Sequence, residues 1–235
     1  MKHSKGILLF VLISFSIIGC ASYQPAVAPS LNYDLTSQQN KVEKEGLVLL
    51  IKPVYMTSEL EAFFDDDLVR NYGILPVHFN LSNKSYPGTL VFSTDSFNLL
   101  SPARERAPIL SSNDVYKKAK KSHWRTVGWT VAFGVFGLIP SIINVENTNK
   151  KIQADLDTKV VKSGNLTVGS QTEGFAFFSI PQTISSLSGW QLSLLLKDLA
   201  NGKEVQIDYG LEGTIIPAKP PQEAEDADKP KGDVK

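Results

Sequence analysis

Apolar and polar residues alternate along two parts of the chain, and a long uncharged stretch separates these parts. In the first part, residues 47–51 form a short aliphatic run, and residues 74–82 alternate between apolar and polar positions. These patterns predict a β-strand covered on both faces and a second strand with one buried face, in which Pro76 suits an edge or a first position. Residues 89–93 form a returning strand after turn-forming residues 83–88.

The second part of the chain repeats this pattern after residue 163. Residues 174–180, 190–198 and 205–211 have the composition of strands, and Asn201-Gly202 predicts a two-residue type I′ hairpin turn between the last two. Short strands on both sides of a helical segment indicate a single domain. We therefore expect a mainly β fold over residues 46–216, an immunoglobulin-like β-sandwich with a helical, apolar insertion at residues 113–162.

One helix is predicted between the first two strands. Its apolar side chains share one face, with Ser58 as the N-cap and Gly73 just beyond the C-terminal end. The apolar positions are Leu60, Phe63, Phe64 and Leu68. Three consecutive aspartates, 65–67, would point about 100° apart on such a helix and could not all face one cation. We interpret them as a solvated helix face and expect no metal site.

The insertion contains a stretch, residues 126–145, without a charged side chain for twenty residues. Such a length can span a bilayer core of about 30 Å. A single crossing would, however, place the strands before and after it on opposite sides of the membrane. The remaining interpretations are a helical hairpin packed on the sandwich, a membrane-surface or re-entrant helix, or two separate β units on opposite sides.

Small residues and tryptophans mark this stretch as a contact surface. The small residues are spaced 4, 3 and 4 along a helix and form a seam that another backbone can approach closely. The two tryptophans follow a lysine-rich segment, as in an interfacial anchor. The candidate contacts with a membrane or a partner are Trp124, Trp129, Thr130, Gly134, Gly137 and Ser141. A helix buried in the domain and self-association through the seam are the alternatives.

The N-terminus has the pattern of an export signal. Lys2 and Lys5 precede an apolar core at residues 7–15, which is too short for a membrane span. The following Ile17-Ile18-Gly19-Cys20 resembles the lipobox of bacterial lipoproteins. The resemblance implies removal of residues 1–19 as a signal peptide, a diacylglycerol thioether on Cys20 and an acylated amine. Because Ala21 follows the cysteine, it also implies the outer membrane, with the domain facing the periplasm. An uncleaved anchor or a different cleavage position is the alternative.

Polar segments flank the predicted domain. Residues 20–45 are interpreted as the lipidated cysteine and a flexible tether with a root-mean-square reach of roughly 25–30 Å. Residues 217–235 contain few apolar side chains, and we expect a disordered tail. The layout of strands, apolar helix and strands is also similar to that of a diffuse group of uncharacterised bacterial lipoproteins, a resemblance that implies no activity.

Charge and composition argue against several classes of function. Residues 1–19 hold two lysines and no acidic residue, so the rest of the chain has 22 basic and 24 acidic residues. This balance gives no electrostatic reason to expect nucleic-acid binding, which would need a basic surface. Cys20 is the single cysteine, and its acylation would leave no thiol for a disulfide, catalysis or metal binding. His78 and His123 belong to no triad or zinc motif. We expect no enzyme activity and no cofactor.

These observations lead to one hypothesis and one alternative. The hypothesis is a non-enzymatic envelope lipoprotein, anchored in the bilayer through Cys20, whose β-sandwich presents an interaction surface while the apolar helix contacts the membrane or an envelope protein. The alternative is a periplasmic ligand-binding or assembly module, in which the apolar helix is buried in the domain or in a protein partner.

Overall fold

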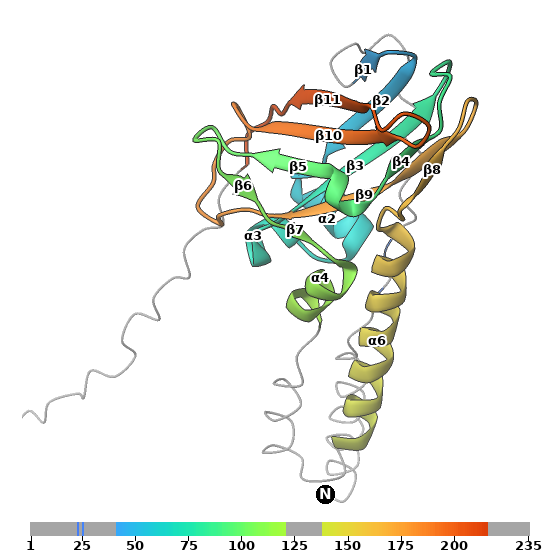
Figure 1. Cartoon of the computed structure of the whole chain (residues 1–235). Helices are drawn as coiled ribbons and strands as arrows, with labels where there is room; N and C mark the ends of the chain where they lie inside the picture. Colours follow the sequence, from blue (N-terminus) through green and yellow to red (C-terminus); the bar gives the residue numbers. More distant parts are fainter. Residues whose placement is uncertain (1–22, 24, 26–40, 121–137, 216–235) are drawn as a thin grey trace, which may run out of the picture.

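Two antiparallel sheets form the body of the protein in a computed structural model that describes residues 23, 25, 41–120 and 138–215 (Figure 1). The first sheet contains, in order, β1 (Lys41–Lys44), β2 (Leu47–Pro53), β3 (Ile74–Asn83), β9 (Gln171–Ser179) and β7 (Ile109–Leu110). The second contains β6 (Arg106–Ala107), β5 (Phe97–Leu100), β10 (Gln191–Asp198), β4 (Leu90–Phe92) and β8 (Gly164–Leu166), and β11 (Glu204–Gly210) also pairs with β10. The predicted mainly β sandwich with helical segments is confirmed.

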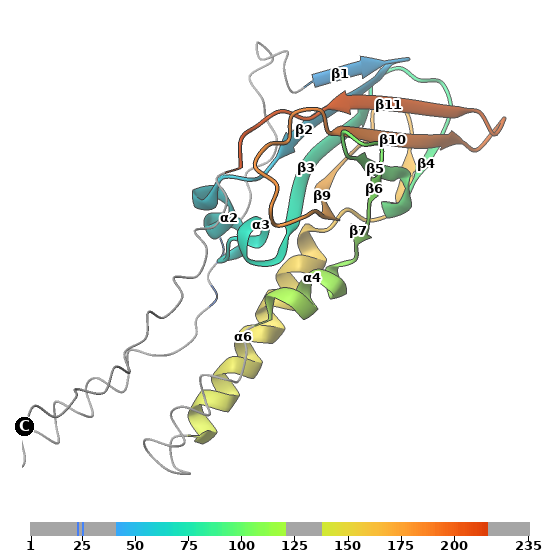
Figure 2. The ribbon, with the colours of Figure 1, turned by 90° about the vertical axis from the view of Figure 1, so that its left-hand side faces the viewer.

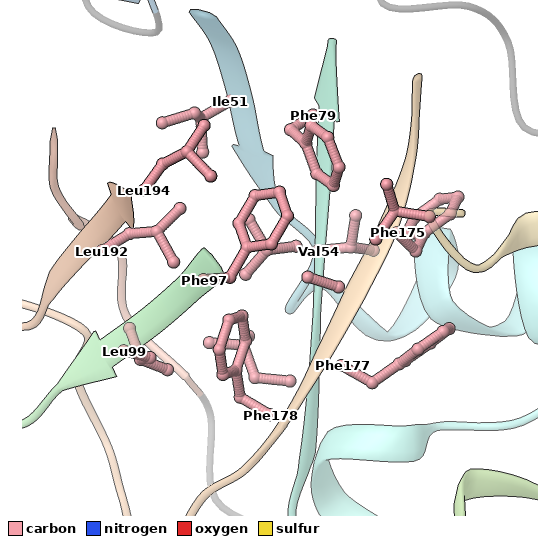
Figure 3. Packing of buried hydrophobic residues seen from close by; sticks show 14 of the residues in the cluster. Ile51, Val54, Phe79, Phe97, Leu99, Phe175, Phe177, Phe178, Leu192 and Leu194 are labelled. Carbon is pink, nitrogen blue, oxygen red and sulfur yellow. The ribbon is translucent and has the colours of Figure 1, made fainter. Parts of the chain in front are cut away.

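The hydrophobic core lies between the two sheets (Figure 3). Phe79 of β3 contacts Phe97 of β5 across the interface, with ring centroids 4.5 Å apart. Within its own sheet each ring lies beside an aliphatic partner, because Ile51 pairs with Phe79 and Leu194 pairs with Phe97. Large apolar side chains at alternate strand positions thus meet from both sheets, as the period of two predicts.

The prediction of one buried face is wrong for β3, because all ten of its residues are buried. The strand is central, between β2 and β9, so Pro76 is not at a sheet edge. Helices cover the outer face of this sheet: the ring of Phe64 meets those of Phe175 and Phe177 edge-on at 5.3 and 5.7 Å. The polar residues of β3 therefore lie under the helices and not in solvent. The alternating pattern could not reveal this, because it contains no information about the helices that pack on the sheet.

The single helix predicted before β3 is two helices, α2 (Thr57–Phe64) and α3 (Leu68–Tyr72). Asp65 ends α2 in the left-handed conformation (φ 55°), and the side chain of Asp67 caps α3 by accepting from the backbone N–H of Arg70. Ser58 is not the N-cap, since α2 begins at Thr57. Gly73 does end α3, with φ 62°, as predicted.

The described residues between β7 and β8 form two helices. They are α4 (Ser112–Ala119) and α6 (Leu138–Lys159), which contact each other. Figures 1 and 2 show α6 extending from the sheets at its C-terminal end to a point well beyond them. On either side of these helices the chain returns to one sheet, where Ile109 of β7 pairs with Phe178 of β9. Two separate β units on opposite sides of a membrane are therefore excluded.

Two local predictions need correction. Residues 41–44, assigned to the tether, form β1, and Tyr23 of the same segment is buried in the core. The hairpin at Asn201-Gly202 exists, but only Gly202 has a positive φ (70°), and four residues separate Asp198 from Lys203, so the turn is not type I′. The predicted signal at residues 1–19 and the tail at 217–235 lie outside the described residues.

Candidate functional site at the helical end

An N-terminal residue docks on the helix that extends from the sandwich. The Tyr23 hydroxyl donates to Asp155 Oδ2 at 2.6 Å, and only 6% of Tyr23 is exposed. Asp155 belongs to the part of α6 that packs on the sandwich, beside the buried Ile152 and Leu156, which are spaced by one helical turn. The chain just after the predicted lipidation point is therefore attached to α6.

Lys159 completes this junction. Its Nζ donates to Asp155 Oδ2 at 2.6 Å and to the carbonyl oxygen of Phe63, and it lies 5.2 Å above the centre of the Phe64 ring. Burial lowers the pKa of Lys159, and the neighbouring Asp155 partly opposes this effect. Burial, together with donation to Asp155, raises the pKa of Tyr23, so its hydroxyl remains protonated. Asp155 thus joins the N-terminal segment, α6 and the end of α2; these three side chains, Tyr23, Asp155 and Lys159, are called the Tyr23 junction below.

A second polar group lies on the helix-covered face of the first sheet. His78 stacks on Phe175 with ring centroids 4.3 Å apart, and its Nε2 lies 3.1 Å from Glu173 Oε1. Lys52, the cross-strand neighbour of His78, forms an ion pair with Glu59 at 2.5 Å. Burial is the main cause that lowers the pKa of His78, and the adjacent Glu173 opposes it. The arrangement is a hydrogen-bonded neutral imidazole with 5% exposure, which gives a substrate little access to the ring.

Two open hollows lie near α2. The larger, about 600 Å³, is lined mainly by polar side chains that include Asp65, Asp66, Asp67 and Arg70. Asp67 accepts from the Thr57 hydroxyl at 2.8 Å, and Asp66 accepts from the Tyr72 hydroxyl at 2.9 Å. The aspartates therefore organise the α2–α3 junction. Within the described ranges, no three His, Cys, Asp or Glu side chains are close enough together to hold a metal ion.

The smaller hollow, about 360 Å³, lies where α2 meets the edge of the second sheet. Tyr55 and Tyr209 line it together with Lys52, Glu59 and Glu212. Its lysine is already paired with Glu59, as described above. Two of the three charged side chains that line this hollow thus pair with each other.

Most of the predicted contact residues lie outside the described part of the chain. This applies to Cys20 and to Trp124, Trp129, Thr130, Gly134 and Gly137, whereas Ser141 lies in the first turns of α6. The Tyr23 junction was not predicted from the sequence. The spacing of Asp155 and Lys159 by four residues could have suggested a helical ion pair, but Tyr23 lies 132 residues from its partner, and no local pattern links them.

Exposed lysines gather on the two helices of this end. They are Lys117, Lys118 and Lys120 near the end of α4, and Lys150 and Lys151 on α6. The acidic residues of the same two helices are Asp114, Glu146, Asp157 and Asp155, and the last is engaged in the Tyr23 junction. In the described part of the chain, no helix combines the length and the apolar composition needed to cross a bilayer.

Comparisons with known proteins give loose structural likenesses. No family model matches the chain, and no curated protein matches its sequence. Among solved structures, the candidate lipoprotein ycdA from Bacillus subtilis subsp. subtilis str. 168 is similar at 8% identity and a TM-score of 0.39 over 74% of this chain. The yjhA protein from Bacillus subtilis is similar at 10% identity and a TM-score of 0.40 over 73% of this chain.

The lengths of these structural neighbours differ. The aligned region spans 39% of ycdA and 96% of yjhA. At these identities and TM-scores, neither likeness carries an argument about family or activity.

Proposed function

We propose that this protein is a non-enzymatic lipoprotein of the bacterial envelope, anchored through acylated Cys20 in the outer membrane and presenting its β-sandwich to the periplasm. The support from the sequence is the coincidence of a basic start, an apolar core and the single cysteine. No cofactor takes part in this function.

The structural observation that carries the proposal is the Tyr23 junction. Tyr23 follows Cys20 by three residues and is already packed against the domain. A cleaved chain would therefore begin with its lipid attachment point immediately before its first domain contact. The enclosed His78 and the ion pairs Lys52–Glu59 and Arg70–Asp67 in the two hollows support a binding or structural role over catalysis.

Acyl labelling tests the anchor. Cells expressing the full chain are grown with alkyne-palmitate, and the labelled protein is followed in membrane and soluble fractions. We expect label and membrane fractionation for the natural chain and loss of both in Cys20→Ala. An unlabelled natural chain, or a Cys20→Ala variant that keeps its label, would refute the proposal.

Ala21→Asp tests the membrane assignment separately. Carried over from the lipoprotein resemblance, an aspartate after the lipidated cysteine should retain the protein in the inner membrane. We expect the natural chain in the outer-membrane band of a density gradient and the variant in the inner-membrane band. Finding the natural chain in the inner-membrane band would contradict the outer-membrane location while leaving the lipid anchor in place.

A periplasmic assembly module is the second candidate, because part of α6 belongs to the domain core. Ile152 and Leu156 are 3% and 2% exposed, so this half of the helix packs on the sandwich. Flotation of Cys20→Ala with protein-free liposomes separates the candidates. Co-flotation supports direct lipid contact by the helices. Its absence favours a helix that packs on the domain or on a protein partner.

A further inference from the structure

We infer that the helical end of the domain, formed by α4, α6 and the docked Tyr23, is the face that lies against the lipid headgroups. The inference rests on the proposed acylation of Cys20. It adds an orientation to the anchor: the sandwich is held close to the bilayer on one defined side, instead of moving at the end of a long tether.

The length of chain between the anchor and the first domain contact limits the separation. Three residues, even fully extended, span at most about 11 Å. The flexible tether expected over residues 20–45 would instead have a reach of roughly 25–30 Å and would allow any orientation. Because Tyr23 is attached to Asp155, the acylated residue has to lie beside α6.

Packing and hydrogen bonds together hold Tyr23 on the domain. The Tyr23 ring is part of the hydrophobic core cluster, and its hydroxyl shares Asp155 Oδ2 with Lys159. Lys159 is bound at the same time to the carbonyl oxygen of Phe63 at the end of α2. Release of Tyr23 would expose an aromatic ring and remove one partner from a partly buried carboxylate.

The direction of α6 shows which end of the molecule is near Tyr23 and which end is far from it. Its 22 residues correspond to about 33 Å, with the C-terminal end at the sheets and the Leu138 end away from them (Figure 2). At the opposite end of the molecule, the β1–β2 and β10–β11 turns are joined by an ion pair between Lys203 and Glu45 at 2.6 Å. A bilayer close to Tyr23 is therefore close to α6 and far from these turns.

The charge of the helical end fits a lipid surface. Five exposed lysines lie on α4, at its C-cap and on α6, against four acidic residues on the two helices, of which Asp155 is bound to Tyr23 and Lys159, in a chain whose charges balance overall. Lysines on a membrane-facing surface interact favourably with anionic headgroups, while their aliphatic stems reach toward the interface. The occupant of this face is accordingly a bilayer that contains anionic lipid.

Energy transfer to the membrane surface tests the orientation. The lipidated full chain is reconstituted in phosphatidylethanolamine–phosphatidylglycerol liposomes whose headgroups carry an acceptor dye. A donor is attached to Gln153→Cys on α6 or to Ala200→Cys in the β10–β11 turn, both of which are exposed positions. We expect clearly stronger transfer from position 153. Equal transfer from both positions would overturn the inference.

Two substitutions and one insertion test the role of Tyr23. Tyr23→Ala should lower the transfer from position 153 toward the value at position 200, whereas Tyr23→Phe, which keeps the ring, should have the smaller effect. Inserting ten Gly/Ser residues between Ser22 and Tyr23 lengthens the link without touching the junction, and it should lower the transfer even if Tyr23→Ala unfolds. If the insertion leaves the transfer unchanged, the short link does not orient the domain.

The same samples separate this inference from the proposed function. If the natural chain carries no acyl label and does not float with liposomes, the anchor itself is refuted. If it floats and is labelled but shows no difference between positions 153 and 200, the anchor stands and the orientation is refuted.

Discussion

Burial sets the protonation of His78, which stacks on Phe175 and faces Glu173 and Lys52 on the neighbouring strands. Loss of hydration lowers its pKa from the usual 6.5, the charge of Lys52 acts in the same direction, and Glu173 acts against both. The imidazole is therefore neutral in the folded protein at neutral pH, although it touches a carboxylate.

A pH dependence of stability follows from this lowered pKa. As pH falls from about 7.5 through 6.5, the unfolded imidazole takes up a proton while the folded one does not, so the free energy of unfolding decreases. Urea titrations at several pH values should show this decrease, and His78→Gln should flatten it. A slope that survives His78→Gln would contradict the argument.

Gly73 has a conformation and a neighbour that together require glycine. Its φ is 62°, and a Cβ atom there would approach the Ile180 carbonyl oxygen to 2.5 Å. Gly202 has a similar φ of 70° but no atom within 4 Å of a Cβ position. We expect Gly202→Ala to cost about 1–2 kcal/mol for the left-handed conformation alone. Gly73→Ala should cost more in the same urea titration, and equal costs would contradict the clash.

At the scale of secondary structure, the three aspartates divide what would otherwise be one helix. Asp67 is buried and accepts from the Arg70 N–H at 3.0 Å and from the Thr57 hydroxyl at 2.8 Å, so it links the start of α3 to the start of α2. Asp65 adopts the left-handed conformation that stops α2. The same residue type thus ends one helix and begins the next.

Substitutions should distinguish these two aspartates. Asp67→Ala removes a cap and leaves the Thr57 hydroxyl without its acceptor, so we expect a loss of about 1–2 kcal/mol in the free energy of unfolding. Asp65→Gly relieves a positive φ and should be neutral or slightly stabilising. Chemical denaturation monitored by circular dichroism gives both values. The division of roles would be wrong if Asp65→Gly were the more damaging change.

Helix α6 combines a half that packs on the domain with a half that extends from it. Leu156→Ala should therefore cost about 2–5 kcal/mol, because it empties a position in the core. Replacing residues 121–145 with about 12 Gly/Ser residues, a link with a reach of roughly 20 Å, should leave a cooperative unfolding transition near its original midpoint. Loss of the folded state on this replacement would show that the apolar stretch is part of the core.

At the scale of the whole molecule, the pairing of β7 with β9 closes the sheet around the helical insertion. The segments before and after the insertion must therefore lie on the same side of any membrane. Protease sites introduced after Arg104 and after Gly169, both exposed, should be cut together from the periplasmic face of spheroplasts while a cytoplasmic marker stays intact. Cleavage at only one site would contradict the single sandwich.

The sequence by itself determined the positions of most elements. The period of two over residues 74–82, the aliphatic run at 47–51 and the Asn-Gly pair at 201–202 located strands and a hairpin, because these signals depend on neighbours within a few residues. For the same reason Gly73 marked a helix end. The lipobox-like segment raised the hypothesis of an anchor, which stays a prediction.

Only the tertiary structure decided what these elements bury and what they contact. The alternation in β3 predicted a solvated face, but helices from other parts of the chain cover it. The docking of Tyr23 on Asp155 joins segments 132 residues apart, and the break at Asp65 depends on side-chain contacts that favour two short helices. Local patterns report which face of an element is apolar. The partner of that face is chosen by packing between distant segments, which no local pattern encodes.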